Sequence, residues 1–117
     1  MPLRTKRIYE NAEPDDGYRL LVMRLWPRGI RKEHVDAWER QLAPTRKLLT
    51  DYRSDVIDWA EYERRYLHEM VSCPDSIRAL SALRWRVSQG NVTILCSCKN
   101  ELHCHRTLLS QLVQKNS

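Results

Sequence analysis

Two short runs of apolar residues have the length of strands that are buried on both faces. The first covers residues 20–23, within the segment YRLLVMRL, and the second lies in the segment NVTILCS. Uninterrupted apolar runs of this length are typical of central strands in parallel sheets, where other elements cover both faces. The segment RTKRIYE near the start mixes charge with Ile8 and Tyr9, which predicts a third, shorter strand.

Later segments repeat their apolar residues every three or four positions, which predicts amphipathic helices. Asp58 is a residue type that caps helix starts. The helix after it places four large side chains on one face: Trp59, Tyr62, Tyr66 and Met70. A second helix is predicted at residues 74–90 and a third at residues 104–115. A short helix is predicted at residues 45–53, whereas residues 32–44 fit either a helical face or an irregular segment.

The order of these elements predicts an α/β fold. A parallel pairing of YRLLVMRL with NVTILCS needs a long crossover, and the helices between them supply it. We therefore expect these strands at the centre of a mostly parallel sheet, with the two long helices packed on it. The chain has 117 residues, 42% of them hydrophobic, which suits one compact domain over residues 1–117.

Composition also sets the expected compartment. No run approaches the roughly 20 apolar residues that a membrane-spanning helix needs, and the start MPLRTKRIYE lacks the apolar stretch of a signal peptide. We expect a soluble, cytoplasmic protein without a membrane partner. Thiols stay reduced in that compartment, so the four cysteines are core residues, metal ligands or reactive groups rather than a disulfide framework.

The formal net charge of +5 is concentrated in two segments. The first holds four basic residues with no acid between them: Arg24, Arg28, Arg31 and Lys32. The second, residues 84–117, has five basic residues against Glu101 alone. If the two segments meet in the fold, they form a positive site that attracts phosphate or another anion. The alternative is that they lie apart as ordinary solvated charges.

The segment CSCKNELHCHR, residues 96–106, gathers the side chains that carry chemistry. It follows the last predicted strand and runs into a helix, the place where open α/β sheets usually bind ligands. Cys96 and Cys98 lie two positions apart, so both thiols face the same side of the strand. Cys96 is more typical of a core position than of a ligand.

Cys104, His105 and Arg106 lie together at the start of the last predicted helix. Free N–H groups and the helix dipole favour an anion there, and they favour the thiolate form of a cysteine. We predict Cys104 as a nucleophile and His105 as a base or acid. Arg106 is predicted to hold a phosphate or carboxylate in two-point contact. The alternative is that the three residues only pack.

Four further residues are predicted to bind the anion. Arg24 and Arg28 flank Trp26, an arrangement that suits stacking on a nucleotide or a nucleic-acid base. Cys98 is assigned to the same anion site. The structural alternative is that Trp26 buries its ring while the arginines cap backbone carbonyls.

A metal site is the competing interpretation of the cysteines. Cys96, Cys98 and Cys104, with His103 or His105, supply the four soft ligands of a tetrahedral zinc ion. The C-x-C spacing differs from the C-x2-C knuckle of structural zinc sites. We therefore predict no stoichiometric zinc, no metal ligands among these residues and no cofactor.

The segments GYRLLVMRLWPRGI and LCSCKNELHCHRTLL resemble a bacterial family, the domain of unknown function 488, and within it the YeaO-like proteins. The resemblance implies a single small Rossmann-like domain and no established activity. In relatives the last strand ends in cysteine, any residue and glutamate, and the helix opens with CHR. This chain has Cys98 in place of the glutamate, and it has Met23 where YeaO-like relatives have aspartate, so two site carboxylates are missing.

The sequence supports three classes of function. The leading one is an α/β protein that binds a phosphate-bearing or other anionic small molecule, either as a thiol-dependent enzyme or as a binding protein. The second is a nucleic-acid-binding module that uses RLWPRGIRK and the basic C-terminal segment. The third is a thiol-based metal or redox sensor.

Overall fold

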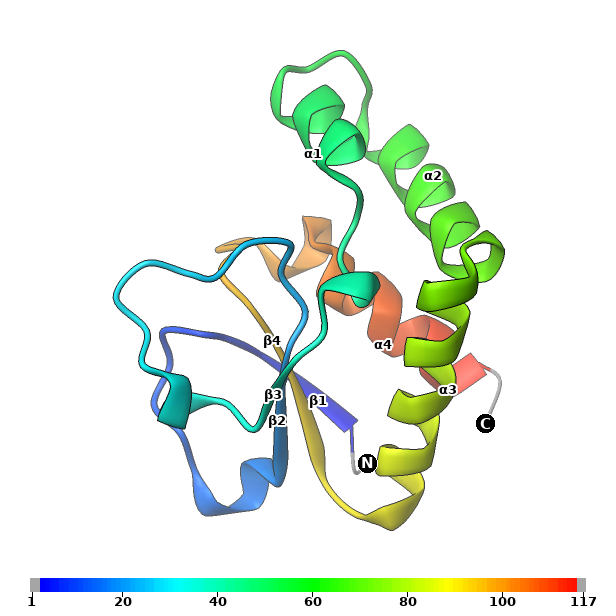
Figure 1. Ribbon diagram of the computed structural model, residues 1–117. Coiled ribbons are helices and arrows are strands. Elements are labelled where there is room, and N and C mark those ends of the chain that lie inside the picture. The colour runs from blue at the N-terminus through cyan, green and yellow to red at the C-terminus, as the bar shows by residue number, and fades with distance from the viewer. Residues whose placement is uncertain (1–2, 116–117) are drawn as a thin grey trace.

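A four-stranded parallel sheet forms the centre of the molecule (Figure 1). The structure is a computed structural model, and it describes residues 3–115. The strand order is β1-β4-β2-β3. The strands are β1 (Leu3–Arg7), β2 (Tyr18–Leu21), β3 (Ala37–Trp38) and β4 (Val92–Cys96). The prediction that YRLLVMRL and NVTILCS form the two central strands is confirmed.

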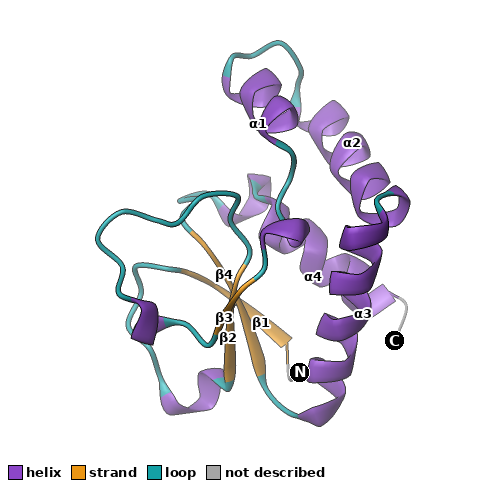
Figure 2. Cartoon of the chain, viewed as in Figure 1, coloured by secondary structure: helices purple, strands orange, loops and turns teal. Residues whose placement is uncertain are grey.

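Four helices accompany the sheet, and their bounds agree with the periodicity of the sequence. They are α1 (Arg46–Arg53), α2 (Trp59–Ser72), α3 (Pro74–Gln89) and α4 (His105–Lys115). The predicted α/β class is therefore confirmed (Figure 2). Among the helices between residues 3 and 115, none is both long and apolar enough to cross a membrane.

The two faces of the sheet are covered by different kinds of structure. Alternate residues of the central strands, such as Leu20 and Ile94, face the helices and join one large apolar core with α2, α3 and α4. Leu21 and Leu95 face the other way and pack against the segment between β2 and β3. Figure 1 shows this segment as a wide loop on the side of the sheet opposite the helices. The helices thus cover one face only.

Residues 32–44, for which the sequence left two alternatives, are irregular. They contain short 3-10 turns at Lys32–His34 and Arg40–Leu42, separated by the two-residue strand β3. The Trp38 indole Nε1 donates to the carbonyl of Met23 at 2.7 Å and so ties the strand to the start of the loop. The apolar residues of this segment do not form a helical face: Val35 and Trp38 pack on the loop side of the sheet, and Leu42 packs in the main core.

Asp58 caps α2 as its sequence position predicted. Its carboxylate accepts a hydrogen bond from the backbone N–H of Glu61 at 2.9 Å. We expect Asp58→Ala to lower the free energy of unfolding by about 1 kcal/mol, because the backbone N–H of Glu61 loses its hydrogen-bond acceptor. Urea denaturation measures the loss. The control Asp58→Asn keeps an acceptor at this position, so a loss as large as that of Asp58→Ala would contradict the capping role.

Candidate functional site

Three cysteines meet between the end of β4 and the start of α4. The Sγ atoms of Cys96 and Cys98 lie 3.8 Å apart. Cys96 and Cys104 are buried, whereas Cys98 is half-buried. The strand brings Cys96 to its carboxyl end, and the turn at Glu101–His103 folds the chain back so that Cys104 returns to the same place. We call Cys96, Cys98 and Cys104 the thiol cluster.

His105 lies beside the thiol cluster in the first turn of α4. Its Nε2 lies 2.5 Å from the carbonyl oxygen of Val22, and its Nδ1 lies 3.9 Å from the Sγ of Cys104. A carbonyl only accepts, so Nε2 carries the proton and Nδ1 presents a lone pair toward Cys104. Burial lowers the pKa of His105, which favours this neutral form.

Arg106 is buried under the same segment. Its Nη1 donates to the carbonyl oxygen of Cys98 at 2.9 Å and lies 3.4 Å from that of Cys96. Its Nε is buried without a partner, and among residues 3–115 the guanidinium forms no ion pair with an acid. Arg106 therefore positions the backbone that carries the thiols and adds positive charge beneath them.

The three thiols have different acidities because they share hydrogen bonds. Hydrogen bonds from Cys104 and Cys96 lower the pKa of Cys98, and the positive charge of Arg106 adds to that effect. Hydrogen bonds to Cys96 and Cys98, together with burial, raise the pKa of Cys104. For Cys96 the hydrogen bond with Cys104 lowers the pKa, but the bond with Cys98 and burial outweigh it and raise the pKa. Cys98, the most exposed member of the cluster, is thus the thiol whose pKa is lowered.

Cys98 opens onto a cavity of about 300 Å³ that we call the arginine pocket. Three basic side chains line it: Arg24, Arg46 and Arg53. No acidic residue is found among the described residues that line it. The remaining wall includes Trp26, Thr50, Ser97 and His105. Positive charge therefore surrounds the accessible thiol.

The three arginines are held in different ways. Arg24 is half-buried, and its guanidinium donates to the carbonyl oxygens of Pro44 and Ala43 at 3.2 and 3.1 Å. Arg46 and Arg53 lie at the two ends of α1 and are exposed. Within the described part of the chain, neither forms a salt bridge. Their charges are available to a ligand.

The structure brings together some of the predicted site residues. Arg24 and Trp26 share the arginine pocket with Cys98 and His105. The two basic segments do not meet there as a whole, because Arg31 and Lys32 line a different hollow and, among the described residues, no lysine or arginine after residue 84 lines this pocket. Arg28 does not line this pocket; it is exposed, and its carbonyl oxygen accepts a hydrogen bond from the Tyr9 hydroxyl. The expected clamp of Arg24 and Arg28 around Trp26 is therefore absent from this pocket.

The structure also revises the roles expected for Cys104 and Arg106. Cys104 has 1% of its surface exposed. It directly precedes α4, but its hydrogen bonds with Cys96 and Cys98, together with burial, raise its pKa instead of lowering it. Arg106 has 2% of its surface exposed, and its Nη1 donates to backbone carbonyl oxygens, so it does not face a ligand. Cys98 takes the place of Cys104 as the accessible thiol. Of the two residues predicted to be catalytic, Cys104 and His105, only His105 is among the described residues that line the pocket.

Arg46 and Arg53 were not predicted as site residues. They lie seven positions apart, two turns of a helix, so one face of α1 carries both charges. That spacing was visible in the sequence. What the sequence lacked was the placement of α1 over the end of β4, which depends on packing between distant segments.

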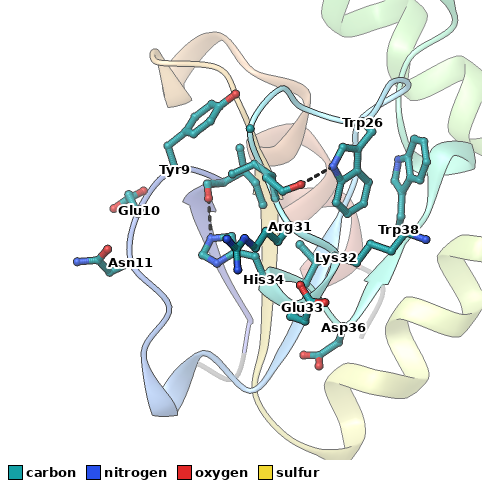
Figure 3. A pocket seen from close by; sticks show the side chains of 14 residues that line it. Tyr9, Glu10, Asn11, Trp26, Arg31, Lys32, Glu33, His34, Asp36 and Trp38 are labelled. Carbon is teal, nitrogen blue, oxygen red and sulfur yellow. Dashed lines mark hydrogen bonds between the residues drawn. The ribbon is translucent and has the colours of Figure 1, made fainter.

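A larger and shallower hollow of about 1310 Å³ lies on the loop side of the sheet (Figure 3). Its wall mixes acids with bases: Glu10, Glu33, Asp36, Arg31 and Lys32. The Trp26 indole donates to the carbonyl of Ile30 at 2.8 Å, and His34 Nε2 lies 2.8 Å from that of Ile8, so these polar groups are already used (Figure 3). This hollow thus carries charges of both signs, whereas the described lining of the arginine pocket has basic residues and no acid.

Comparison with known proteins finds relatives of matching length. A family model described as "Active DUF488-N3 subclade" matches residues 3–117. The chain is 34% identical over 112 residues to the uncharacterized protein YeaO of Escherichia coli (strain K12). The aligned region covers 94% of this chain and 95% of that relative. It is 35% identical over 113 residues to an uncharacterized protein of Mycobacterium tuberculosis (strain ATCC 25618 / H37Rv), over 95% of this chain and 92% of that one. No solved structure matches the chain.

Proposed function

The chain belongs to the DUF488-N3a family, as the resemblance in its sequence indicated, and we propose that it binds a small phosphate-bearing or other anionic molecule in the arginine pocket. In this proposal Cys98 is the thiol that faces the bound molecule. Cys104 and Arg106 support the site from below rather than touch the ligand. The proposal keeps the anionic ligand expected from the sequence and moves the reactive position from Cys104 to Cys98.

One observation carries this proposal. Three guanidinium groups and no carboxylate are found among the described side chains around a half-buried thiol. Guanidinium groups stay charged at all physiological pH values and bind phosphate or carboxylate oxygens in two-point contacts. Clustered cations destabilise the folded protein because like charges repel one another, and a bound anion reduces that repulsion.

The size and lining of the pocket suit a small organic anion. Its volume of about 300 Å³ lies at the lower end of the range for small-molecule sites. Trp26 and Leu49 supply apolar surface, while Thr50 and Ser97 supply hydroxyl groups. A ligand with a charged group and a small flat or apolar portion satisfies both kinds of wall. Cys98 then lies next to the ligand as the strongest nucleophile type in the wall.

Protection of Cys98 by phosphate tests the proposal. We expect millimolar inorganic phosphate to slow iodoacetamide labelling of Cys98 severalfold at constant ionic strength, because a bound anion covers the thiol. Cys73 is a half-buried cysteine next to α3 that does not line this pocket, and it serves as the internal control. Mass spectrometry of peptides follows each cysteine. Equal labelling rates of Cys98 with and without phosphate would refute an anion site at this position.

A further inference from the structure

We propose that the thiol cluster and His105 form a binding site for a thiophilic d10 cation, with Zn²⁺ as the reference ion. The ligands are Cys96, Cys98, Cys104 and the Nδ1 of His105. This inference goes beyond the anion site, since it concerns the floor of the arginine pocket rather than its walls. It reverses the expectation of no stoichiometric zinc, which was based on sequence spacing.

The distances between ligand atoms approach those of a tetrahedral site. Two thiolates on one zinc ion, each with a bond of about 2.3 Å, lie about 3.8 Å apart. The Sγ atoms of Cys96 and Cys98 lie 3.8 Å apart. A thiolate and an imidazole nitrogen on zinc lie about 3.6 Å apart, and Cys104 Sγ lies 3.9 Å from His105 Nδ1. The donor atoms of Cys96, Cys104 and His105 all lie within 4.8 Å of one another and form the core of the site. Cys98 lies outside that group and is placed as the fourth ligand by its distance to Cys96.

The orientation of His105 supports the same assignment. A histidine that binds a metal usually donates its other ring N–H to a carbonyl or carboxylate, which fixes the ring and its tautomer. His105 has this arrangement, because Nε2 meets the carbonyl of Val22 and Nδ1 faces Cys104. The other candidate from the sequence, His103, is not in the group of close donor atoms and instead stacks on Trp59, with ring centroids 4.8 Å apart.

The charge of the surroundings also fits. Zn²⁺ with three thiolates and a neutral imidazole carries a net charge of −1. Arg106 is a buried cation next to the cluster, with carbonyls as its hydrogen-bond acceptors and no salt bridge within residues 3–115. A buried charge needs compensation. A cluster of charge −1 directly beside Arg106 provides it.

The C-x-C spacing of Cys96 and Cys98 does not exclude zinc in the folded chain. A C-x2-C knuckle matters where one short loop must supply two ligands, whereas here a strand end and a helix start supply them together. The fold presets these positions through β4 and α4. Half-buried Cys98 lies in the wall of the arginine pocket and gives the ion a path to the buried ligands.

Cobalt titration of the reduced, chelator-treated protein tests the site. We expect one Co²⁺ per chain, with thiolate charge-transfer absorption and the visible bands of tetrahedral cobalt, and displacement by Zn²⁺. Cys98→Ser should weaken cobalt binding at least about tenfold and reduce the thiolate absorption. Cys73→Ser is the matched control and should change neither. Circular dichroism confirms that Cys98→Ser, at a half-buried position, keeps its fold.

The outcome separates this site from the anion site. Absence of one-to-one cobalt binding in the reduced protein would overturn the metal site, as would an effect of Cys73→Ser equal to that of Cys98→Ser. Phosphate protection of Cys98, measured with a chelator present, does not depend on the metal. Conversely, Lys47→Gln with Arg64→Gln should leave cobalt binding unchanged, because these exposed cations lie outside the pocket. Loss of cobalt binding in that double variant would also contradict the assigned ligands.

Discussion

Replacing Asp16 with asparagine is expected to lower the free energy of unfolding by about 3 kcal/mol, because the change leaves buried positive charge without its partner. Asp16 has 1% of its surface exposed. Its carboxylate pairs with Arg19, and it accepts hydrogen bonds from Lys6 and Arg4 at 3.2 Å each. It thereby joins the turn before β2 to β1. Urea denaturation monitored by tryptophan fluorescence measures the loss.

Asp15→Asn is the matched control. Asp15 is the neighbouring acid, largely exposed, and its salt bridge to Arg4 at 3.3 Å lies at the surface. Exposed pairs contribute about 0–1 kcal/mol. A loss for Asp16→Asn no larger than that for Asp15→Asn would show that the buried network does not stabilise the fold.

The same carboxylate predicts a pH dependence. Burial raises the pKa of Asp16, but hydrogen bonds from the Glu13 backbone, Lys6 and Arg19 outweigh it, and the net shift is downward from the ordinary value of 3.8. A depressed folded-state pKa adds stability above the unfolded-state pKa, and that stability is lost as the pH falls from there through the folded value. Asp16→Asn should therefore unfold with a flatter pH dependence below about pH 4 than the unchanged protein.

The second large effect concerns the charge of the arginine pocket. Iodoacetate and iodoacetamide alkylate a thiolate in the same way, with loss of iodide, but only iodoacetate is an anion. We expect Arg46→Gln with Arg53→Gln to lower the ratio of iodoacetate to iodoacetamide labelling rates at Cys98 by about tenfold. Each exposed charge contributes about threefold at 0.1 M salt, the condition used for both this variant and its control. The thiolate fraction cancels from the ratio, so the ratio reports the field alone.

A double variant with the same change in net charge provides the control. Lys47→Gln with Arg64→Gln removes two exposed cations outside the pocket, Lys47 from α1 and Arg64 from α2. It should change the ratio at Cys98 by less than about twofold, since exposed charges are screened over roughly 10 Å at 0.1 M salt. Equal effects of the two double variants would mean that net charge, and not the pocket, sets the ratio.

The fold was largely predictable because its elements carry strong local signals. Four residues at the spacing of a helical face placed α2, and Asp58 and Pro74 marked where α2 and α3 begin. The apolar runs of β2 and β4 predicted central strands because both faces are covered. The segment of residues 32–44 was not predictable, since Val35, Trp38 and Leu42 have helical spacing but pack under the sheet and on the core as separate contacts.

The sequence indicated which side chains gather after β4 but not which of them are accessible. The motif after β4 placed the thiols at the carboxyl end of the sheet, and Arg24 and Trp26 line the same pocket. Whether Cys98 or Cys104 is accessible depends on one detail of backbone geometry, the turn before His105 that directs Cys104 inward. Arg46 and Arg53 reach the site through the placement of α1, which no local pattern encodes.

Titration of the protein with inorganic phosphate, followed by the amide chemical shifts, tests the central claim most directly. The account predicts saturable shifts confined to residues of the arginine pocket, such as Thr50, Arg53, Ser97 and Cys98, and the loss of these shifts in the Arg46→Gln, Arg53→Gln variant. A chloride titration to the same ionic strength corrects for salt. Shifts that do not saturate, or that centre on the hollow of Figure 3 instead, would contradict the claim.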